Sequence, residues 1–177
     1  MGRGTRATPP DDLAAFYVEQ FDRVRGALAL VTGDRQLGEE LAQEAFVRAC
    51  QHWERVRTMD APGAWVHRVG INLAISRGRR TRSERRAHRR LRAERPVDEV
   101  TPDGADESLR AALLDLGLDE RSVIVLRLYA DLSVAQVAGV LGIPEGTVKT
   151  RTRTGLAALR AVGLVAPDEA DVNEEVR

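Results

Sequence analysis

The chain has 177 residues, enough for one compact domain or two small ones, and its 27 Lys and Arg are balanced by 27 Asp and Glu. Its single cysteine, Cys50, excludes an internal disulfide framework and a multi-cysteine zinc site, which favours a reducing cytosol. Its apolar runs are too short to span a bilayer and its first ten residues lack the apolar core of a signal peptide, so we expect a cytoplasmic protein.

Helical periodicity dominates the chain and strand alternation is lacking, so we predict an all-α fold. Apolar residues recur at spacings of three and four over residues 13–31, which predicts an amphipathic helix ended by Gly33. Asp34 can cap a second helix, whose apolar stripe includes Cys50 and Trp53. These two helices present one apolar side each, and they are expected to pack together.

Asp60 followed by Pro62 opens a third predicted helix, because proline is tolerated in a first helical turn. Three helices over residues 11–90 can close one small core. The balanced overall charge hides a strong local asymmetry: residues 76–95 contain ten arginines against two glutamates, whereas residues 96–109 contain five acids and no basic residue. The average charge therefore does not exclude nucleic acid as a partner.

The acidic segment also contains Pro96, Pro102 and Gly104 and few apolar residues, a composition typical of a solvated linker between two small helical domains. Beyond this linker, four short helices are predicted, over residues 109–116, 122–128, 134–141 and 148–159. The predicted organisation is a disordered start (1–10), a first helical domain (11–92), a flexible acidic linker (93–107), a second helical domain (108–164) and a disordered acidic tail (165–177).

Residues 132–151 have the spacing of a helix-turn-helix, in which Ser133 caps the first helix, Gly142 permits the turn and Pro144 starts the second helix. The second helix mixes cations, which neutralise phosphates, with short hydroxyls that reach base edges in a major groove. Spacing alone is also compatible with an ordinary helical hairpin, but a basic face of one sign favours DNA binding. Its candidate DNA-binding residues are Thr147, Lys149, Thr150, Arg151, Arg153 and Thr154.

A second candidate surface lies on the third helix, where Arg68, Asn72, Ser76 and Arg79 share one face and the arginine run continues from its end. Asparagine offers a donor and an acceptor to a base edge, and arginine holds phosphate. The alternative is a disordered basic arm without a defined target. Two DNA-capable surfaces on one chain favour the first interpretation.

An enzyme is a poor interpretation of this sequence. Cys50, His52, His67 and His88 are its only thiol and imidazole groups, and Cys50 is expected to be packed in the apolar stripe. Cys50 and His52 are two residues apart, so a helix directs them to different faces. We therefore expect no catalytic residue, no metal site, no cofactor and no small-molecule substrate.

Three segments together resemble the bacterial sigma-70 family of transcription initiation factors, in its small extracytoplasmic-function group and there its actinobacterial, sigma-E-like members. EELAQEAFVR (39–48) resembles the region that docks on core RNA polymerase. AWVHRVGINLAISRGRR (64–80) resembles the regions that open and read the promoter minus-10 element. Residues 118–160, with GTVKTR opening the recognition helix, resemble the region that binds the minus-35 element.

The resemblance implies a dissociable specificity subunit whose partners are core RNA polymerase, promoter DNA and an anti-sigma factor. It assigns the helix-turn-helix residues to the minus-35 element. The implied polymerase-binding residues are Glu40, Gln43, Glu44 and Arg48. The implied minus-10 residues are Arg68, Asn72, Ser76, Arg77, Arg79 and Arg80.

The chain departs from the common family pattern at Ile71, Ser76, Thr152 and Thr154, so we expect a variant promoter sequence. The alternative function is a stand-alone helix-turn-helix regulator. That alternative leaves the acid-lined face of residues 39–51 without a partner, and it predicts tight promoter binding without polymerase. RNA binding by the arginine run would require aromatic stacking groups that this segment lacks.

Overall fold

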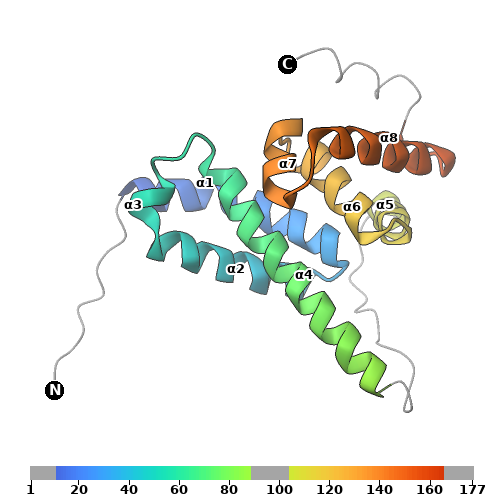
Figure 1. The fold of residues 1–177 in the computed structure, drawn as a ribbon, viewed down its shortest axis with the longest axis horizontal. Coiled ribbons are helices and arrows are strands. Elements are labelled where there is room, and N and C mark those ends of the chain that lie inside the picture. The colour runs from blue at the N-terminus through green and yellow to red at the C-terminus, as the bar shows by residue number, and fades with distance from the viewer. Residues whose placement is uncertain (1–10, 89–103, 166–177) are drawn as a thin grey trace.

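The computed structural model describes residues 11–88 and 104–165, and in this part of the chain it contains helices and no strand (Figure 1). The predicted disordered ends and most of the predicted linker lie outside the described residues. None of the described helices has the length and apolar character needed to cross a membrane. The elements are α1 (Asp11–Thr32), α2 (Arg35–Gln51), α3 (Trp53–Val56), α4 (Pro62–His88), α5 (Gly104–Asp115), α6 (Leu118–Ile124), the π-helical turn η1 (Val125–Tyr129), α7 (Val134–Leu141) and α8 (Glu145–Ala161).

The predicted helix-end signals at Gly33, Asp34 and Pro62 are confirmed. The second helix is shorter than predicted, because α2 ends at Gln51 and Trp53, predicted on its apolar stripe, begins the short helix α3. Gly33 follows α1 with a φ of 75°, a left-handed conformation that glycine adopts without strain. The Asp34 carboxylate accepts a hydrogen bond of 2.9 Å from the backbone N–H of Leu37 and so caps α2. Pro62 is the first residue of α4. The short helix α3 was not predicted, because a single helical turn is too short to show a hydrophobic periodicity.

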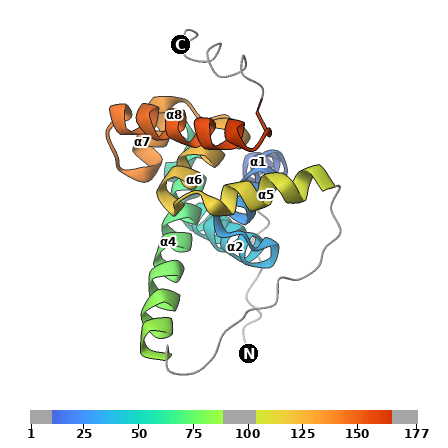
Figure 2. The ribbon, with the colours of Figure 1, turned by 90° about the vertical axis from the view of Figure 1, so that its right-hand side faces the viewer.

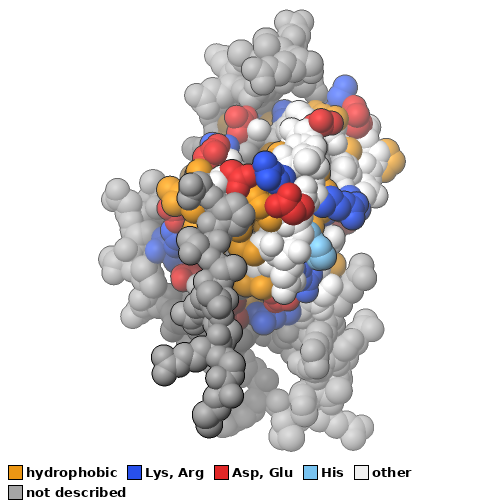
Figure 3. Space-filling view, turned by 90° about the vertical axis from the view of Figure 1, so that its left-hand side faces the viewer, with side chains coloured by type: hydrophobic (Ala, Val, Ile, Leu, Met, Phe, Trp, Pro, Cys, Tyr) orange, Lys and Arg blue, Asp and Glu red, His pale blue; other side chains and the backbone are white. Residues whose placement is uncertain are grey.

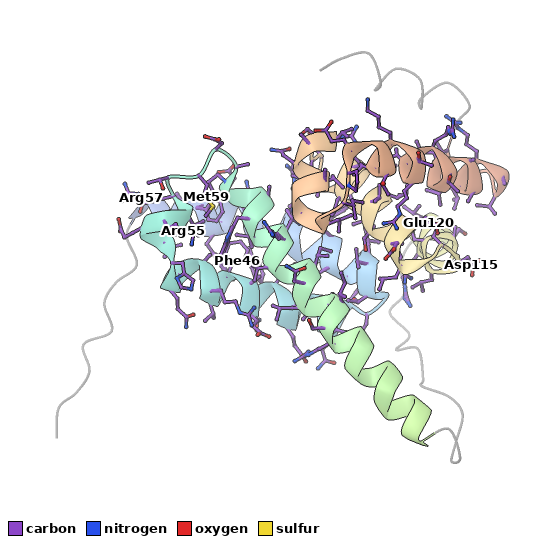
Figure 4. The ribbon with its side chains drawn as sticks, in the orientation of Figure 1. Phe46, Arg55, Arg57, Met59, Asp115 and Glu120 are labelled. Atoms are coloured by element: carbon purple, nitrogen blue, oxygen red, sulfur yellow. The ribbon has the colours of Figure 1, made fainter. Side chains whose placement is uncertain are left out.

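The core of the first unit forms between α1, α2 and α4. Phe46 points from α2 into this core and is buried (Figure 4). Its ring lies 5.9 Å from that of Phe16, 5.0 Å from that of Tyr17 and 5.6 Å from that of Phe21. These aromatic contacts bring one face of α1 onto α2, and the two helices share the most extensive packing among the described elements.

The second unit contains the predicted helix-turn-helix, formed by α7 and α8. Ser133 caps α7 in a reciprocal capping box with Gln136, and Gly142 ends α7 with a φ of 66°. Val148, Leu156 and Leu159 are buried on the inner side of α8, as predicted. The turn between the two helices is therefore fixed by the residues that the sequence analysis selected.

Three element boundaries in the second unit differ from the prediction. Helix α5 begins at Gly104, inside the predicted linker, and Pro144 precedes α8 as its cap instead of starting it. The helix predicted over 122–128 begins at Leu118 and continues as η1, where the Ala130 N–H donates to the Val125 carbonyl at 3.0 Å. This bond spans five residues, so the π-helical turn shifts the direction of the chain before α7.

The two units pack against each other. Helix α1 contacts α5, α6 and η1, and α4 contacts α7 (Figure 2). A single apolar cluster runs from Val24 and Leu28 of α1 to Val123 and Leu126 of the second unit. The sequence predicted two tethered modules, and it carried no signal for this shared core.

Candidate nucleic-acid and polymerase-binding surfaces

The outer face of α8 carries the first predicted surface. Lys149, Thr150, Arg153 and Thr154 are exposed, whereas Thr147 is half-buried. The Thr150 hydroxyl donates to the Gly146 carbonyl at 2.9 Å, and the Thr154 hydroxyl donates to the Thr150 carbonyl at 3.1 Å. Because each hydroxyl hydrogen is used within the helix, these oxygens face outward mainly as hydrogen-bond acceptors.

The two arginines of this helix differ. Arg151 donates to the Asp119 carboxylate of α6 at 2.8 Å, and its side chain is only 28% exposed. Arg153 is exposed and forms no ion pair with any of the described residues. The structure therefore separates a guanidinium that ties α8 to α6 from one that is available to a phosphate.

The second predicted surface lies on α4, whose C-terminal half projects beyond the packed core (Figure 1). Arg68, Asn72 and Ser76 are exposed, in agreement with their predicted common face. Arg77 is also exposed, but its guanidinium pairs with the Glu40 carboxylate of α2 at 2.8 Å. The side chains of Arg79 and Arg80 lie outside the described set, although the helix itself continues to His88.

The third predicted surface is the outer face of α2. Glu40, Gln43 and Arg48 are exposed and Glu44 is half-exposed, with an ion pair of 2.8 Å between Arg48 and Glu44. Val47 lies on the same face and is 55% exposed, an apolar side chain among charged ones. Val47 is not among the predicted docking residues, although its spacing of three residues from Glu44 and four from Gln43 already places it on their face.

The thiol of Cys50 differs from expectation. Cys50 is exposed, so the prediction that it packs as a small hydrophobe is wrong: α2 turns its side chain to solvent while Ala49 fills the core. It borders a shallow hollow with His52 and Trp53, at an end of the molecule where basic, acidic and apolar side chains are mixed (Figure 3). The described residues contain no cluster of three or more potential metal ligands.

His67 is the largest polar side chain in the core of the described residues. It is 1% exposed, and neither ring nitrogen has a hydrogen-bond partner among the described residues. Burial, assisted by the nearby positive charge of Arg23, lowers the pKa of His67 to about 4. The imidazole is therefore neutral at pH 7, and it acts as part of the packing of α4.

Comparisons with known proteins cover both helical units of the chain. The family model described as Sigma-70 region 2 matches residues 17–84, and the model described as Sigma-70, region 4 matches residues 112–161. The chain is 36% identical over 142 residues to the ECF RNA polymerase sigma factor SigL of Mycobacterium tuberculosis, covering 77% of this chain and 79% of the relative. It is 34% identical over 131 residues to the RNA polymerase sigma-E factor of Streptomyces coelicolor, covering 73% of each chain.

A solved structure shares the fold. This is the sigma factor RpoE in complex with the anti-sigma factor NepR from Bartonella quintana, which superposes with a TM-score of 0.74 at 19% sequence identity. The superposition covers 86% of this chain and 97% of that chain. The shared architecture therefore includes both helical units.

Proposed function

The chain belongs to the sigma-70 family of RNA polymerase sigma factors, in its extracytoplasmic-function group, and from this premise we propose how its surfaces direct core polymerase to a promoter. The observation that supports the proposal is the presence of three separate exposed surfaces on one small chain, on α2, α4 and α8. The faces of α4 and α8 have the chemistry of DNA-binding surfaces, and the face of α2 has that of a protein-docking surface.

The face of α8 would enter the major groove of the minus-35 element. Lys149 and Arg153 would neutralise phosphates, and Thr150 and Thr154 would meet base edges with their outward oxygens. Arg151 would support this helix through its ion pair with Asp119 and contact DNA at the edge of the groove. Thr147, near the start of α8, would lie close to the sugar-phosphate backbone.

The exposed face of α4 would hold the minus-10 element as its strands separate. Unstacking a base costs a few kcal/mol, so the open state requires contacts that the closed duplex does not make. Asn72 has the paired donor and acceptor of a base-reading side chain, and Arg68 beside it can hold a phosphate. Ser76, Arg77, Arg79 and Arg80 would continue the contact along the projecting helix.

The face of α2 would dock on core RNA polymerase. Glu40, Gln43, Glu44 and Arg48 supply a charged rim, and Val47 supplies an apolar contact at its centre. A stand-alone DNA-binding regulator has no use for such a face. An anti-sigma factor is a further proposed partner, because the sigma factor of similar fold is described in complex with one.

The proposed role requires no catalytic residue, metal or cofactor, because the polymerase supplies the chemistry. It also places the chain in the cytoplasm, where its polymerase and promoters are. The test is a purified transcription assay in which core polymerase is given a promoter from the same genome. Start-site selection should depend on this protein, and an unchanged pattern of start sites would contradict the proposal.

A further inference from the structure

Two threonines on the outer face of α8 hold their hydroxyl hydrogens within the helix. The Thr150 hydroxyl donates to the Gly146 carbonyl at 2.9 Å, and the Thr154 hydroxyl donates to the Thr150 carbonyl at 3.1 Å. A hydroxyl group has one hydrogen and two lone pairs. Because both hydrogens are already used, the two oxygens offer lone pairs to any molecule that approaches this exposed face.

The surface beside these two oxygens is open. Thr150 and Thr154 are four residues apart and therefore lie in one row along the helix, and Gly146, one turn earlier, continues this row. A Cβ atom at Gly146 would meet nothing within 4 Å. Because helical side chains lean toward the N-terminus, the Thr150 side chain lies over the turn at Gly146, which has no side chain to cover it.

The neighbouring row on α8 has the opposite hydrogen-bonding character. Lys149 and Arg153 are both exposed and are also four residues apart. Ammonium and guanidinium groups donate hydrogen bonds and accept none, so they can pair with phosphates and with base acceptors but not with amino groups. The outer face of α8 therefore separates donors from acceptors in two adjacent rows.

The four bases differ in what they offer to such an acceptor in the major groove. Adenine presents its N6 amino group and cytosine its N4 amino group, whereas guanine and thymine present no hydrogen-bond donor there. An oxygen that only accepts can therefore pair with adenine or cytosine on the strand that it faces, and not with guanine or thymine. A threonine whose hydroxyl hydrogen is free can also donate, and it would not make this distinction.

We propose that Thr150 and Thr154 each select an amino-bearing base, adenine or cytosine, on the strand that they face in the minus-35 element. This inference rests on the proposed function, because it requires that α8 lies in the major groove of that element. The two threonines are about 6 Å apart along the helix axis. Successive bases of a strand are about 3.4 Å apart, so the two selected positions should lie within about two base pairs of each other.

The test is a binding selection with core polymerase that carries this protein, from promoter fragments whose minus-35 segment is randomised. Thr150→Val and Thr154→Val remove the acceptor, keep the branched shape and have a similar helix propensity. Thr152→Val is the matched control, because the Thr152 hydroxyl donates to the Val148 carbonyl at 2.9 Å but its side chain is half-buried. Thr150→Ser keeps the hydroxyl and removes only the methyl group.

Sequencing of the bound fragments should show two positions at which the reference chain enriches adenine and cytosine together. Each valine variant should lose this enrichment at one of the two positions, a change of about 2- to 10-fold in relative binding. Thr152→Val and Thr150→Ser should keep both enrichments. A purine base without the amino group, placed at a selected adenine, should weaken binding of the reference chain by the same factor and leave the matching valine variant unaffected.

A selection that depends on this protein but is identical for the reference chain and both valine variants would overturn the inference and leave the proposed function standing. A valine variant that instead loses a preference between purines and pyrimidines would overturn it as well. If one valine variant fails to fold, undiminished binding of the reference chain to the purine without an amino group would overturn it. Equal selection with and without this protein would contradict the proposed function, and this inference with it.

Discussion

The guanidinium of Arg77 lies 2.8 Å from the carboxylate of Glu40, so the face proposed for the minus-10 element is tied to the face proposed for polymerase. Both side chains are about half exposed, at 48% and 50%. An exposed pair of this kind contributes at most about 1 kcal/mol, so either partner can be taken by another molecule. Polymerase that binds Glu40 would thereby release Arg77 for DNA.

Glu40→Gln tests this relationship. Its affinity for core polymerase should fall, while the free energy of unfolding should change by less than about 1 kcal/mol, because the lost pair is exposed. Binding is measured by titration with labelled core polymerase and stability by urea unfolding. Asp115→Asn, an exposed acid at the end of α5, is the control for a lost negative charge. Undiminished polymerase affinity would remove Glu40 from the docking face.

Glu44→Arg reverses a charge in the rim of the same face, and it also removes the partner of Arg48. Repulsion from a complementary basic surface should abolish polymerase binding in the titration that serves for Glu40→Gln. The outer face of α8, proposed to bind the minus-35 element, is not changed by this substitution, so weak, salt-sensitive binding to DNA should persist. Normal recruitment of polymerase by this variant would place the docking surface on another element.

The two arginines of α8 should behave differently when replaced by alanine. Arg153→Ala should reduce transcription and lower the salt dependence of promoter binding by about one released ion, with stability unchanged. Arg151→Ala should also weaken the packing of α8 on α6, because it leaves Asp119 unpaired. Promoter titrations at several salt concentrations and urea unfolding separate the effects. Loss of polymerase binding by Arg153→Ala would contradict the assignment.

His67 predicts a pH dependence of stability. Its folded pKa of about 4 lies below the ordinary value of 6.5, so the unfolded chain takes up the proton first as the pH falls. The contribution of His67 to the free energy of unfolding is therefore unaffected by pH above about 6.5. It falls as the pH drops from 6.5 to 4, and the free energy of unfolding is lower by about 2 kcal/mol at pH 5. Urea unfolding at pH 7 and pH 5 measures this loss. His67→Leu should remove most of this pH-dependent loss of stability, whereas the exposed His52→Gln should leave it unchanged. Equal pH-dependent losses in the two variants would exclude His67 as the source.

Gly38 and Gly139 allow a matched comparison of a crowded and an open position within a helix. A Cβ at Gly38 would lie 2.5 Å from the backbone nitrogen of Ala29, so Gly38→Ala must push α2 away from α1 and should cost about 1–3 kcal/mol. Gly139 of α7 is exposed, and a Cβ there meets nothing within 4 Å, so Gly139→Ala should stabilise by about 0.5–1 kcal/mol. Thermal unfolding compares them. A neutral Gly38→Ala would mean that the helices do not cross this closely.

The sequence predicted what local chemistry determines. Ser133, Gly142 and Asp34 act through backbone groups within a few residues of themselves, and their predicted capping and turn roles are confirmed. The apolar stripe predicts a buried Cys50 because periodicity cannot resolve the edge of such a stripe, whereas the structure exposes Cys50 to solvent. The neighbouring Ala49 takes the buried position instead.

Contacts between residues far apart in the chain could not be predicted from the sequence. Nothing within α1 indicates that Gly26 faces a tyrosine about a hundred residues later, and the acidic linker suggested independent units. The pairing of Arg77 with Glu40 likewise depends on how α4 crosses α2. Helical periodicity predicts solvent-facing positions for both residues, which is correct, but it could not show that they form an ion pair.

The most direct test of the whole account compares promoter binding with and without core RNA polymerase. Fluorescence anisotropy of a labelled promoter fragment should show weak, salt-sensitive and poorly selective binding by the free protein. Addition of core polymerase should give tight binding to that fragment and not to one with both elements scrambled. Tight, selective binding by the free protein, or no effect of polymerase, would contradict the account.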